Sequence, residues 1–202
     1  CNTAINASHE DEFEGRVFVV NNQRVAYMNK MAMFEARFLI DQGKSGKEIK
    51  EYLEKTRSEC GVYIAVDTLK YLKKGGRVTP AAAAIGTLLN IKPILQIHGG
   101  KLDAYPKVMS MKQARAKMIA ATRKEIEEAK EGKVYIGMAH SNPDINAKEV
   151  QDFIQDVKEA LSDLPFFTCD PLPLFIVCHT GPGALAVGYC VDRMGAIKDM
   201  FK

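Results

Sequence analysis

The stretch IKPILQIHGGKLDAYPKV, from Ile91 to Val108, decides the fold class of this chain. Its two halves, residues 91–97 and 101–108, have the composition of strands and flank His98-Gly99-Gly100. Glycine readily adopts the positive φ angles that a tight turn between antiparallel strands requires. The stretch therefore predicts a β-hairpin, and with it a sheet that is not purely parallel.

Strand and helix patterns alternate around this hairpin. They predict strands at 62–66, 134–139, 166–169, 174–178 and 185–191, helices at 69–74, 80–89, 112–130 and 145–161, and a short helix in the tail. Ser141 or Asn142 is expected to cap the helix that follows it. Residues 59–202 are therefore predicted to form an α+β domain, in which helices pack on a mixed or antiparallel sheet.

The upstream residues, 1–58, have a different pattern. Residues 17–20 are predicted to form a short strand, and residues 27–42 a helix that stops at Gly43. Ser45 and Glu48 have the spacing of a capping box before a second helix, 47–55. This strand-helix-helix order is typical of a parallel α/β unit, so the first 58 residues are interpreted as the C-terminal remnant of an N-terminal α/β domain.

Composition excludes several classes of protein. The chain has 202 residues, 47% of them hydrophobic and 26% charged, and a net charge of +3. Such values are ordinary for a globular protein and give no support for nucleic-acid binding. The sequence also contains no apolar run of about 18 residues, the length that could cross a membrane. The five cysteines show no metal-ligand spacing and are interpreted as free thiols in a reducing cytoplasm.

The first candidate site residues lie in the run from Asp67 to Arg77, DTLKYLKKGGR. Asp67 is expected to cap the short helix, and Gly75-Gly76 to turn the backbone sharply. Arg77 leaves this turn with a guanidinium that suits a carboxylate or a phosphate. An ordinary helix end with a solvated arginine is the alternative.

The second candidate is the run HTGPGA, from His179 to Ala184. A histidine at the end of the predicted strand could donate a hydrogen bond to an anion, or act as an acid or base near neutral pH. The glycines that follow could expose backbone N–H groups to an anion. The alternative is a hydrogen-bonded histidine beside a structural turn.

Apolar runs accompany both candidates, at 81–89 with 91–97 and at 172–177. Such runs usually form core. A cavity that ends at Arg77 and His179 would instead suit a long acyl chain with an anionic head, because each buried CH₂ contributes about 0.8 kcal/mol. The candidates for lining this tunnel are Ile85, Leu88, Leu89, Ile94 and Phe175.

Three blocks, 67–77, GTLLNIKPIL at 86–95 and 179–184, together resemble the DegV family of bacterial fatty-acid-binding proteins. The resemblance implies a two-domain protein that binds one long-chain fatty acid and has no other cofactor. It places Arg77 and His179 near the fatty-acid carboxylate. It also implies that the protein is not itself a catalyst, and that it presents the acid to a separate fatty acid kinase for phospholipid synthesis. Transient contact with a membrane is compatible with that role.

The chain departs from the family pattern at two places. Cys1-Asn2-Thr3-Ala4 resembles the helix after an early Ser-Gly-Thr-like turn, so the chain is expected to lack about the first third of the family's sequence. Members of the family often carry a basic residue where this chain has Met109. Lys107, Met109 and Lys112 are therefore the candidates for a partner-facing surface.

Two other functions fit the same residues. One is an enzyme that acts on a small anionic substrate, with His179 as acid or base and Arg77 as the anion clamp. That enzyme would need a small, wet pocket in place of a long apolar tunnel. The other is an interaction module in which the apolar runs close onto each other and bind no ligand.

Overall fold

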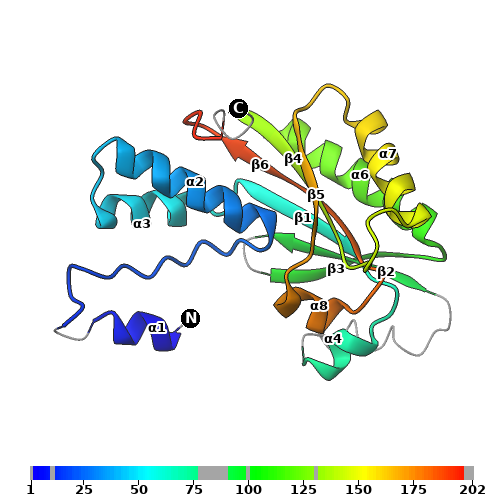
Figure 1. The fold of residues 1–202 in the computed structure, drawn as a ribbon, viewed down its shortest axis with the longest axis horizontal. Helices are drawn as coiled ribbons and strands as arrows, with labels where there is room; N and C mark the ends of the chain where they lie inside the picture. The colour runs from blue at the N-terminus through cyan, green and yellow to red at the C-terminus, as the bar shows by residue number, and fades with distance from the viewer. Residues whose placement is uncertain (1, 10–11, 77–90, 99–100, 130–131, 198–202) are drawn as a thin grey trace.

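A six-stranded sheet organises the chain (Figure 1). The structure, a computed structural model, describes residues 2–9, 12–76, 91–98, 101–129 and 132–197. Its strand order is β3-β2-β1-β6-β4-β5, and neighbouring strands are antiparallel except β4 and β5, which are parallel. The strands are β1 (Cys60–Ala65), β2 (Lys92–His98), β3 (Lys101–Val108), β4 (Lys133–His140), β5 (Phe166–Pro171) and β6 (Leu185–Asp192). This mixed sheet confirms the predicted fold class.

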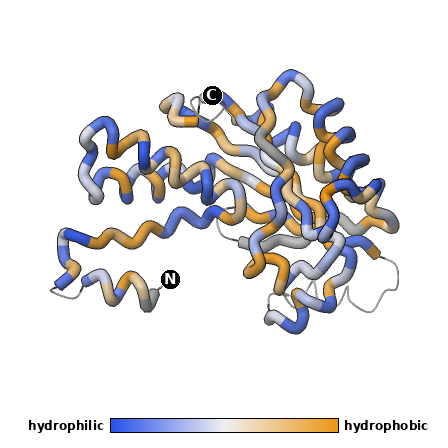
Figure 2. The backbone as a smooth tube through the Cα atoms, viewed as in Figure 1, coloured by the Kyte–Doolittle hydropathy of each residue, from blue (hydrophilic) through white to orange (hydrophobic). Residues whose placement is uncertain are grey.

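Helices cover both faces of the sheet. The described helices are α1 (Asn2–Ala7), α2 (Tyr27–Asp41), α3 (Gly46–Lys55), α4 (Lys70–Lys74), α6 (Met111–Glu128), α7 (Lys148–Ala160) and α8 (Leu174–Thr180), of which α1 and α3 lie away from the sheet. One core cluster joins α6 and α7 to one face, through Met118, Phe153 and Val157. A second cluster joins the start of α2, α4 and the α8 segment to the opposite face, through Met28, Leu72 and Leu172. Figure 2 shows hydrophobic residues concentrated along the sheet.

The hairpin that decided the fold class is confirmed. β2 and β3 pair from Lys92 with Val108 to His98 with Lys101, and β2 also pairs with β1. Alternate residues of β2 enter different cores, because successive side chains of a strand point to opposite faces. Ile94 lies in the core beneath α6, whereas Leu95 lies in the core on the α8 side.

Helices α2 and α3 form a pair that extends away from the sheet in Figure 1. They share a small core of Ala32, Leu39, Ile49 and Leu53. The predicted capping box is confirmed, since Ser45 and Glu48 exchange both capping hydrogen bonds at the start of α3.

The strand predicted at residues 17–20 is wrong. The segment has no strand structure, and Val17 and Phe18 are 45% and 38% exposed. A strand needs a neighbour for its backbone hydrogen bonds. Among the described residues no strand pairs with this segment, which lies apart from the sheet in Figure 2.

The strand predicted at residues 174–178 is also wrong, because these residues begin helix α8. A short apolar run cannot distinguish a strand from a helix by periodicity. Pro173 stands at the N-cap with a φ of −57°, and the N–H that proline lacks would be unpaired at a helix start in any case. The preceding residues, Phe166–Pro171, already form edge strand β5 as predicted.

Of the remaining predicted helices, one starts later than expected and two fall wholly or mostly outside the described residues. Helix α7 begins at Lys148 and not at residue 145, because Asn142 and Asp144 first make turns by accepting the N–H groups of Asp144 and Asn146. The helix predicted at residues 80–89 lies outside the described residues, as does most of the predicted tail helix.

No helix in the described ranges combines the length and apolar character needed to cross a membrane.

Candidate functional site

The candidate site lies at one edge of the sheet. β1 and β4 both run antiparallel to β6, and β4 is parallel to β5, so all three strands end at this edge. Three connections therefore leave it together: the Asp67–Gly76 segment after β1, Ser141 after β4, and α8 after β5. The topology brings together the two runs that the sequence singled out.

His179 lies in the last turn of α8 and not at the end of a strand. Its side chain is half-buried and packs on Gly75, where an added Cβ would come within 2.2 Å of the His179 Nδ1 atom. That nitrogen is buried and has no hydrogen-bond partner among the described residues. The imidazole therefore retains hydrogen-bonding capacity, which a polar ligand group could satisfy.

Glycine is required at position 181 for two reasons. Its φ is +74°, which disfavours other residues, and an added Cβ would lie 2.2 Å from the ring of Tyr71. Gly183 also has a positive φ, +78°. The turn after α8 thus brings its backbone directly against α4, which carries Tyr71.

Ser141 fastens this turn to the end of β4. Its Oγ donates a 2.6 Å hydrogen bond to the carbonyl oxygen of Gly181 and accepts a 2.8 Å bond from the N–H of Ala184. Its own N–H donates to the Ala184 carbonyl oxygen at 2.9 Å. The prediction that Ser141 or Asn142 caps the next helix is wrong, because the N-cap residue of α7 is Ala147, with no side-chain cap bond. The Ser141 hydroxyl instead bonds a turn about 40 residues away in the chain.

Asp67 does not cap α4, contrary to expectation. No side-chain cap bond is present at the N-cap residue Leu69, and Asp67 instead pairs with Lys92 at the start of β2. Thr68 Oγ1 accepts the N–H of Lys70 at 3.2 Å. Lys92 was not foreseen as a residue near the site, because only the pairing of β2 with β1 brings it to Asp67.

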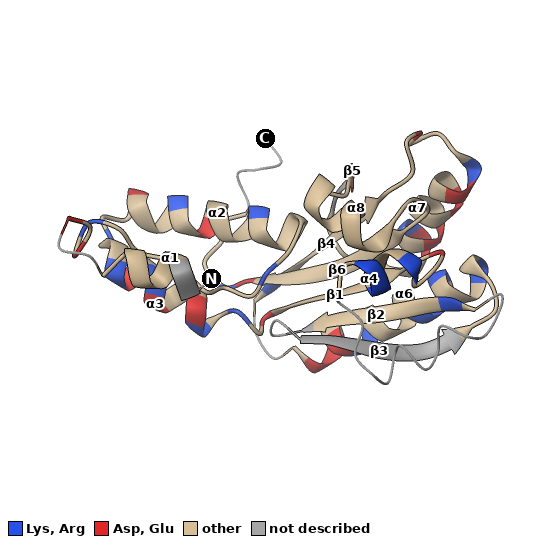
Figure 3. Ribbon diagram, turned by 90° about the horizontal axis from the view of Figure 1, so that it is seen from below, with Lys and Arg blue, Asp and Glu red and all other residues tan. Residues whose placement is uncertain are grey.

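Helix α4 places positive charge beside α8. Helix α4 carries Lys70, Lys73 and Lys74, all exposed, whereas α8 has no Lys, Arg, Asp or Glu. Figure 3 shows the blue α4 beside the uncharged α8. The local charge therefore favours an anionic ligand.

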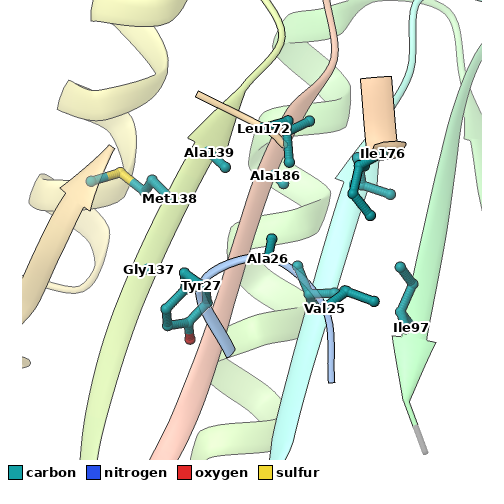
Figure 4. A pocket seen from close by; sticks show the side chains of 12 residues that line it. Val25, Ala26, Tyr27, Ile97, Gly137, Met138, Ala139, Leu172, Ile176 and Ala186 are labelled. Atoms are coloured by element: carbon teal, nitrogen blue, oxygen red, sulfur yellow. The ribbon is translucent and has the colours of Figure 1, made fainter. Parts of the chain in front are cut away.

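An apolar slot lies on the same face of the sheet as α8 (Figure 4). Its free space is about 20 Å³, enough for a water-sized molecule. Side chains from the sheet form its floor, and the strap of residues 25–27 together with the α8 segment form its walls. The lining residues are Val25, Ala26, Tyr27, Val62, Ile64, Ile97, Gly137, Met138, Ala139, Leu172, Ile176 and Ala186.

The strap over the slot and the two residues before it have an unusual backbone. Gln23 and Ala26 have φ angles of +53° and +49°, which are uncommon for residues with a side chain. Buried Arg24 anchors the strap through an ion pair with Glu35 and a 3.1 Å bond to the Thr56 carbonyl oxygen. Tyr27 packs so closely on the sheet that a Cβ at Gly137 would meet its ring at 2.5 Å. Burial raises the pKa of the Tyr27 hydroxyl well above its usual value, so the slot wall stays neutral.

The predicted site residues are only partly brought together. Arg77, Ile85, Leu88 and Leu89 lie outside the described residues. Ile94 is buried on the face opposite the slot, and Phe175 is 63% exposed on α8. The slot residues Val25, Tyr27 and Ile176 were not foreseen, because they are far apart in the sequence and meet only in the folded chain.

The predicted partner-facing residues lie near the start of α6. Met109 is 64% exposed, and Lys112 lines an open groove of about 660 Å³ between α6 and α7. The backbone of Lys107 lies in β3. Within the described ranges, no group of three or more His, Cys, Asp or Glu side chains could hold a metal ion.

Comparison with known sequences identifies relatives along nearly the whole chain. A sequence model of the DegV family, described as an uncharacterised protein family, matches residues 3–192. A DegV domain-containing protein of Deinococcus radiodurans is 31% identical over 179 residues, which are 87% of this chain and 60% of the relative. Another, of Listeria monocytogenes, is 31% identical over 193 residues, which are 93% of this chain and 66% of the relative. The chain thus spans about 60% of the length of the first relative.

Solved structures share the fold. A DegV family protein of Thermus thermophilus, described for its fatty-acid binding, has a TM-score of 0.73 and 31% identity over 89% of this chain and 62% of its own. A Thermotoga maritima protein described as revealing a fatty-acid-binding function has a TM-score of 0.69 at 26% identity, over 94% of this chain and 63% of its own. A stearic-acid-binding protein of Eubacterium ventriosum has a TM-score of 0.80 at 19% identity, over 95% of this chain and 66% of its own, which supports the fold alone.

Proposed function

The chain belongs to the DegV family, and from this membership we propose that it is a non-catalytic carrier of one long-chain fatty acid. The observation that carries the proposal is the slot of Figure 4, which no charged side chain lines. The α8 segment supplies Leu172 and Ile176 to this slot and His179 to the polar edge. The apolar slot would hold the acyl chain of a fatty acid, and the polar, positively charged edge near His179 would hold its carboxylate. The Thermus thermophilus relative, described for fatty-acid binding, supports the same ligand.

The acyl chain is proposed to enter the slot by displacing its walls. A free space of about 20 Å³ is far smaller than a long acyl chain, so the slot must widen on binding. The strap of residues 25–27 belongs to the predicted first unit, 1–58, and the floor belongs to the second, 59–202. We therefore place the acyl chain at the junction between these two units.

The carboxylate is proposed to lie between His179 and Arg77. His179 Nδ1 is buried with no partner among the described residues, and so can take up a hydrogen bond to a carboxylate. Arg77 follows two residues after Gly75, on which the imidazole packs. A guanidinium there would bind the carboxylate through paired, charge-assisted hydrogen bonds.

We further propose that the protein delivers the bound acid to a fatty acid kinase. The surface near Lys107, Met109 and Lys112 would face that kinase, and the groove between α6 and α7 adjoins it at Lys112. On this proposal the protein works in the cytoplasm and forms no covalent intermediate with the acid. Any contact with a membrane would be transient.

Native mass spectrometry of the purified protein, followed by lipid extraction, tests the proposal. The expected result is one bound long-chain acid, since each additional buried CH₂ adds about 0.8 kcal/mol to binding. His179→Ala should weaken binding of that acid, whereas Lys158→Ala, on the exposed side of α7, should not. A protein that carries no lipid and takes up no added fatty acid contradicts the carrier function. That result would favour an enzyme for a small anion, with His179 as acid or base.

A further inference from the structure

Two adjacent residues, His140 at the end of β4 and Ser141 directly after it, hold the two ends of the connection between β5 and β6. The N–H of Leu172 donates to the His140 carbonyl oxygen at 2.7 Å, and the N–H of Ser141 donates to the Ala184 carbonyl oxygen at 2.9 Å. The segment between Leu172 and Ala184, which includes α8 and His179, is therefore a loop pinned at both ends. The position of His179 depends on how the second end is held.

The hydroxyl of Ser141 supplies the additional bonds at that second end. As donor it satisfies the Gly181 carbonyl oxygen, and as acceptor it satisfies the N–H of Ala184, which is fully buried. Removing the hydroxyl would leave a buried N–H without a partner, so the turn would move to find one. Gly181 and Gly183 both allow such movement, because glycine tolerates many backbone conformations.

The turn is coupled directly to His179. The N–H of Gly181 makes the closing bond of α8, to the Val177 carbonyl oxygen at 2.8 Å. His179 lies two residues before Gly181, and both pack against α4, at Gly75 and Tyr71 respectively. A shift of Gly181 would therefore move the imidazole relative to Gly75.

We infer that Ser141 is a positioning residue, which holds the imidazole of His179 in place to bind the carboxylate of the ligand. The inference rests on the proposed function and adds a residue to its carboxylate site. Ser141 does not act as a nucleophile in this role, because its proton is donated to Gly181. It acts through His179 and does not touch the ligand.

A double-mutant cycle on the intact protein tests this role, with stearate as the probe. Ser141→Ala should weaken stearate binding about tenfold, and Ser141→Thr, which keeps the hydroxyl, should restore most of the affinity. In the His179→Ala background, Ser141→Ala should change the dissociation constant less than about twofold. Asn142→Ala, which alters the neighbouring turn without touching Gly181, is the matched control and should bind as the parent does.

Two results would overturn the inference while leaving the carrier function intact: unchanged binding by Ser141→Ala, or losses from Ser141→Ala and His179→Ala that simply multiply. If the parent protein binds no stearate, the proposed function fails and the inference fails with it. Near-ultraviolet circular dichroism checks that each variant is folded. Should Ser141→Ala not fold, Ser141→Cys takes its place in the cycle, because a thiol is a weaker donor of similar shape, and the same two results decide.

Discussion

At the scale of single residues, a close contact explains why glycine is needed at one position of the site and merely favoured at a turn elsewhere in the chain. Gly181 and Gly43 have the same φ, +74°, yet only Gly181 has a neighbour where a Cβ would lie. That neighbour is the ring of Tyr71 on α4. Gly181 thus combines a positive φ with a steric clash, whereas Gly43 has the positive φ alone.

Gly181→Ala should therefore destabilise the protein more than Gly43→Ala. Both variants place a side chain at a positive φ. Gly181, with φ +74° and ψ −177°, lies in a backbone region that is essentially restricted to glycine and costs other residues about 1–3 kcal/mol. Gly181→Ala adds about 1–3 kcal/mol of overpacking against Tyr71. Urea unfolding of the two variants measures the difference. Only Gly181→Ala should also weaken fatty-acid binding. Equal destabilisation would show that Tyr71 moves aside freely.

The sequence indicated part of the site at this scale. The described part of the first candidate run, residues 67–76, does meet the second, residues 179–184, at one edge of the sheet. The roles expected of Asp67 and Ser141 as helix caps were wrong, because each side chain bonds a distant residue in preference to the nearby helix. Such partners depend on strand pairing, which a local pattern does not contain.

At the scale of elements, the capping box of α3 is a local motif whose electrostatics can be tested. Glu48 accepts hydrogen bonds from the backbone N–H and the hydroxyl of Ser45, and Lys44 lies 2.9 Å from its carboxylate. The backbone bond from Ser45 contributes most to lowering the pKa of Glu48, to about 2. The group is exposed, so its contribution is best measured as a change with pH.

Glu48→Gln should lower the melting temperature most near neutral pH. A carboxyl whose pKa falls on folding stabilises the native state above its unfolded pKa of about 4.3. That stabilisation disappears as the pH falls toward the folded value of about 2. Melting temperatures of parent and variant should therefore converge between about pH 4.3 and pH 2. Glu51→Gln, on the exposed side of the same helix, is the control, and an equal pH-dependent gap in both variants would contradict the assignment.

Elements with a distinctive local signal were predicted well, and elements that depend on neighbours were not. Turn glycines and capping residues correctly located the hairpin of β2 and β3 and helices α2 and α3. The short apolar runs at residues 17–20 and 174–178 both predict strands. The first has no strand beside it, and the second follows Pro173 into a helix. Neither outcome is determined by hydrophobicity alone.

At the scale of the whole molecule, ligand binding and stability should be linked through the slot. A ligand that binds only the folded chain raises the free energy of unfolding by about 2.7 kcal/mol at one hundred times its dissociation constant. For a domain of this size that corresponds to a rise in melting temperature of roughly 5–11 °C.

Thermal unfolding with and without stearate measures this linkage. Octadecanol, which has the same chain without the carboxylate, is the control and should give a smaller rise at the same concentration. Equal shifts would show that the polar edge near His179 contributes nothing to affinity. No shift at a concentration that saturates binding would mean that the ligand binds the unfolded chain equally well.

The strand order has a consequence for how the chain is made. Of the described strands β6 comes last in the chain, yet it lies between β1 and β4 and pairs Cys60 with Cys190, which is 130 positions further along the chain. Until β6 leaves the ribosome, the hairpin sheet β3-β2-β1 and the pair β4-β5 have no strand to join them. The facing edges of β1 and β4 therefore stay unpaired until β6 is made, a situation that favours aggregation and chaperone binding. A nascent chain that stops before Leu185 would therefore hold two separate half-sheets, and the final strand makes them one.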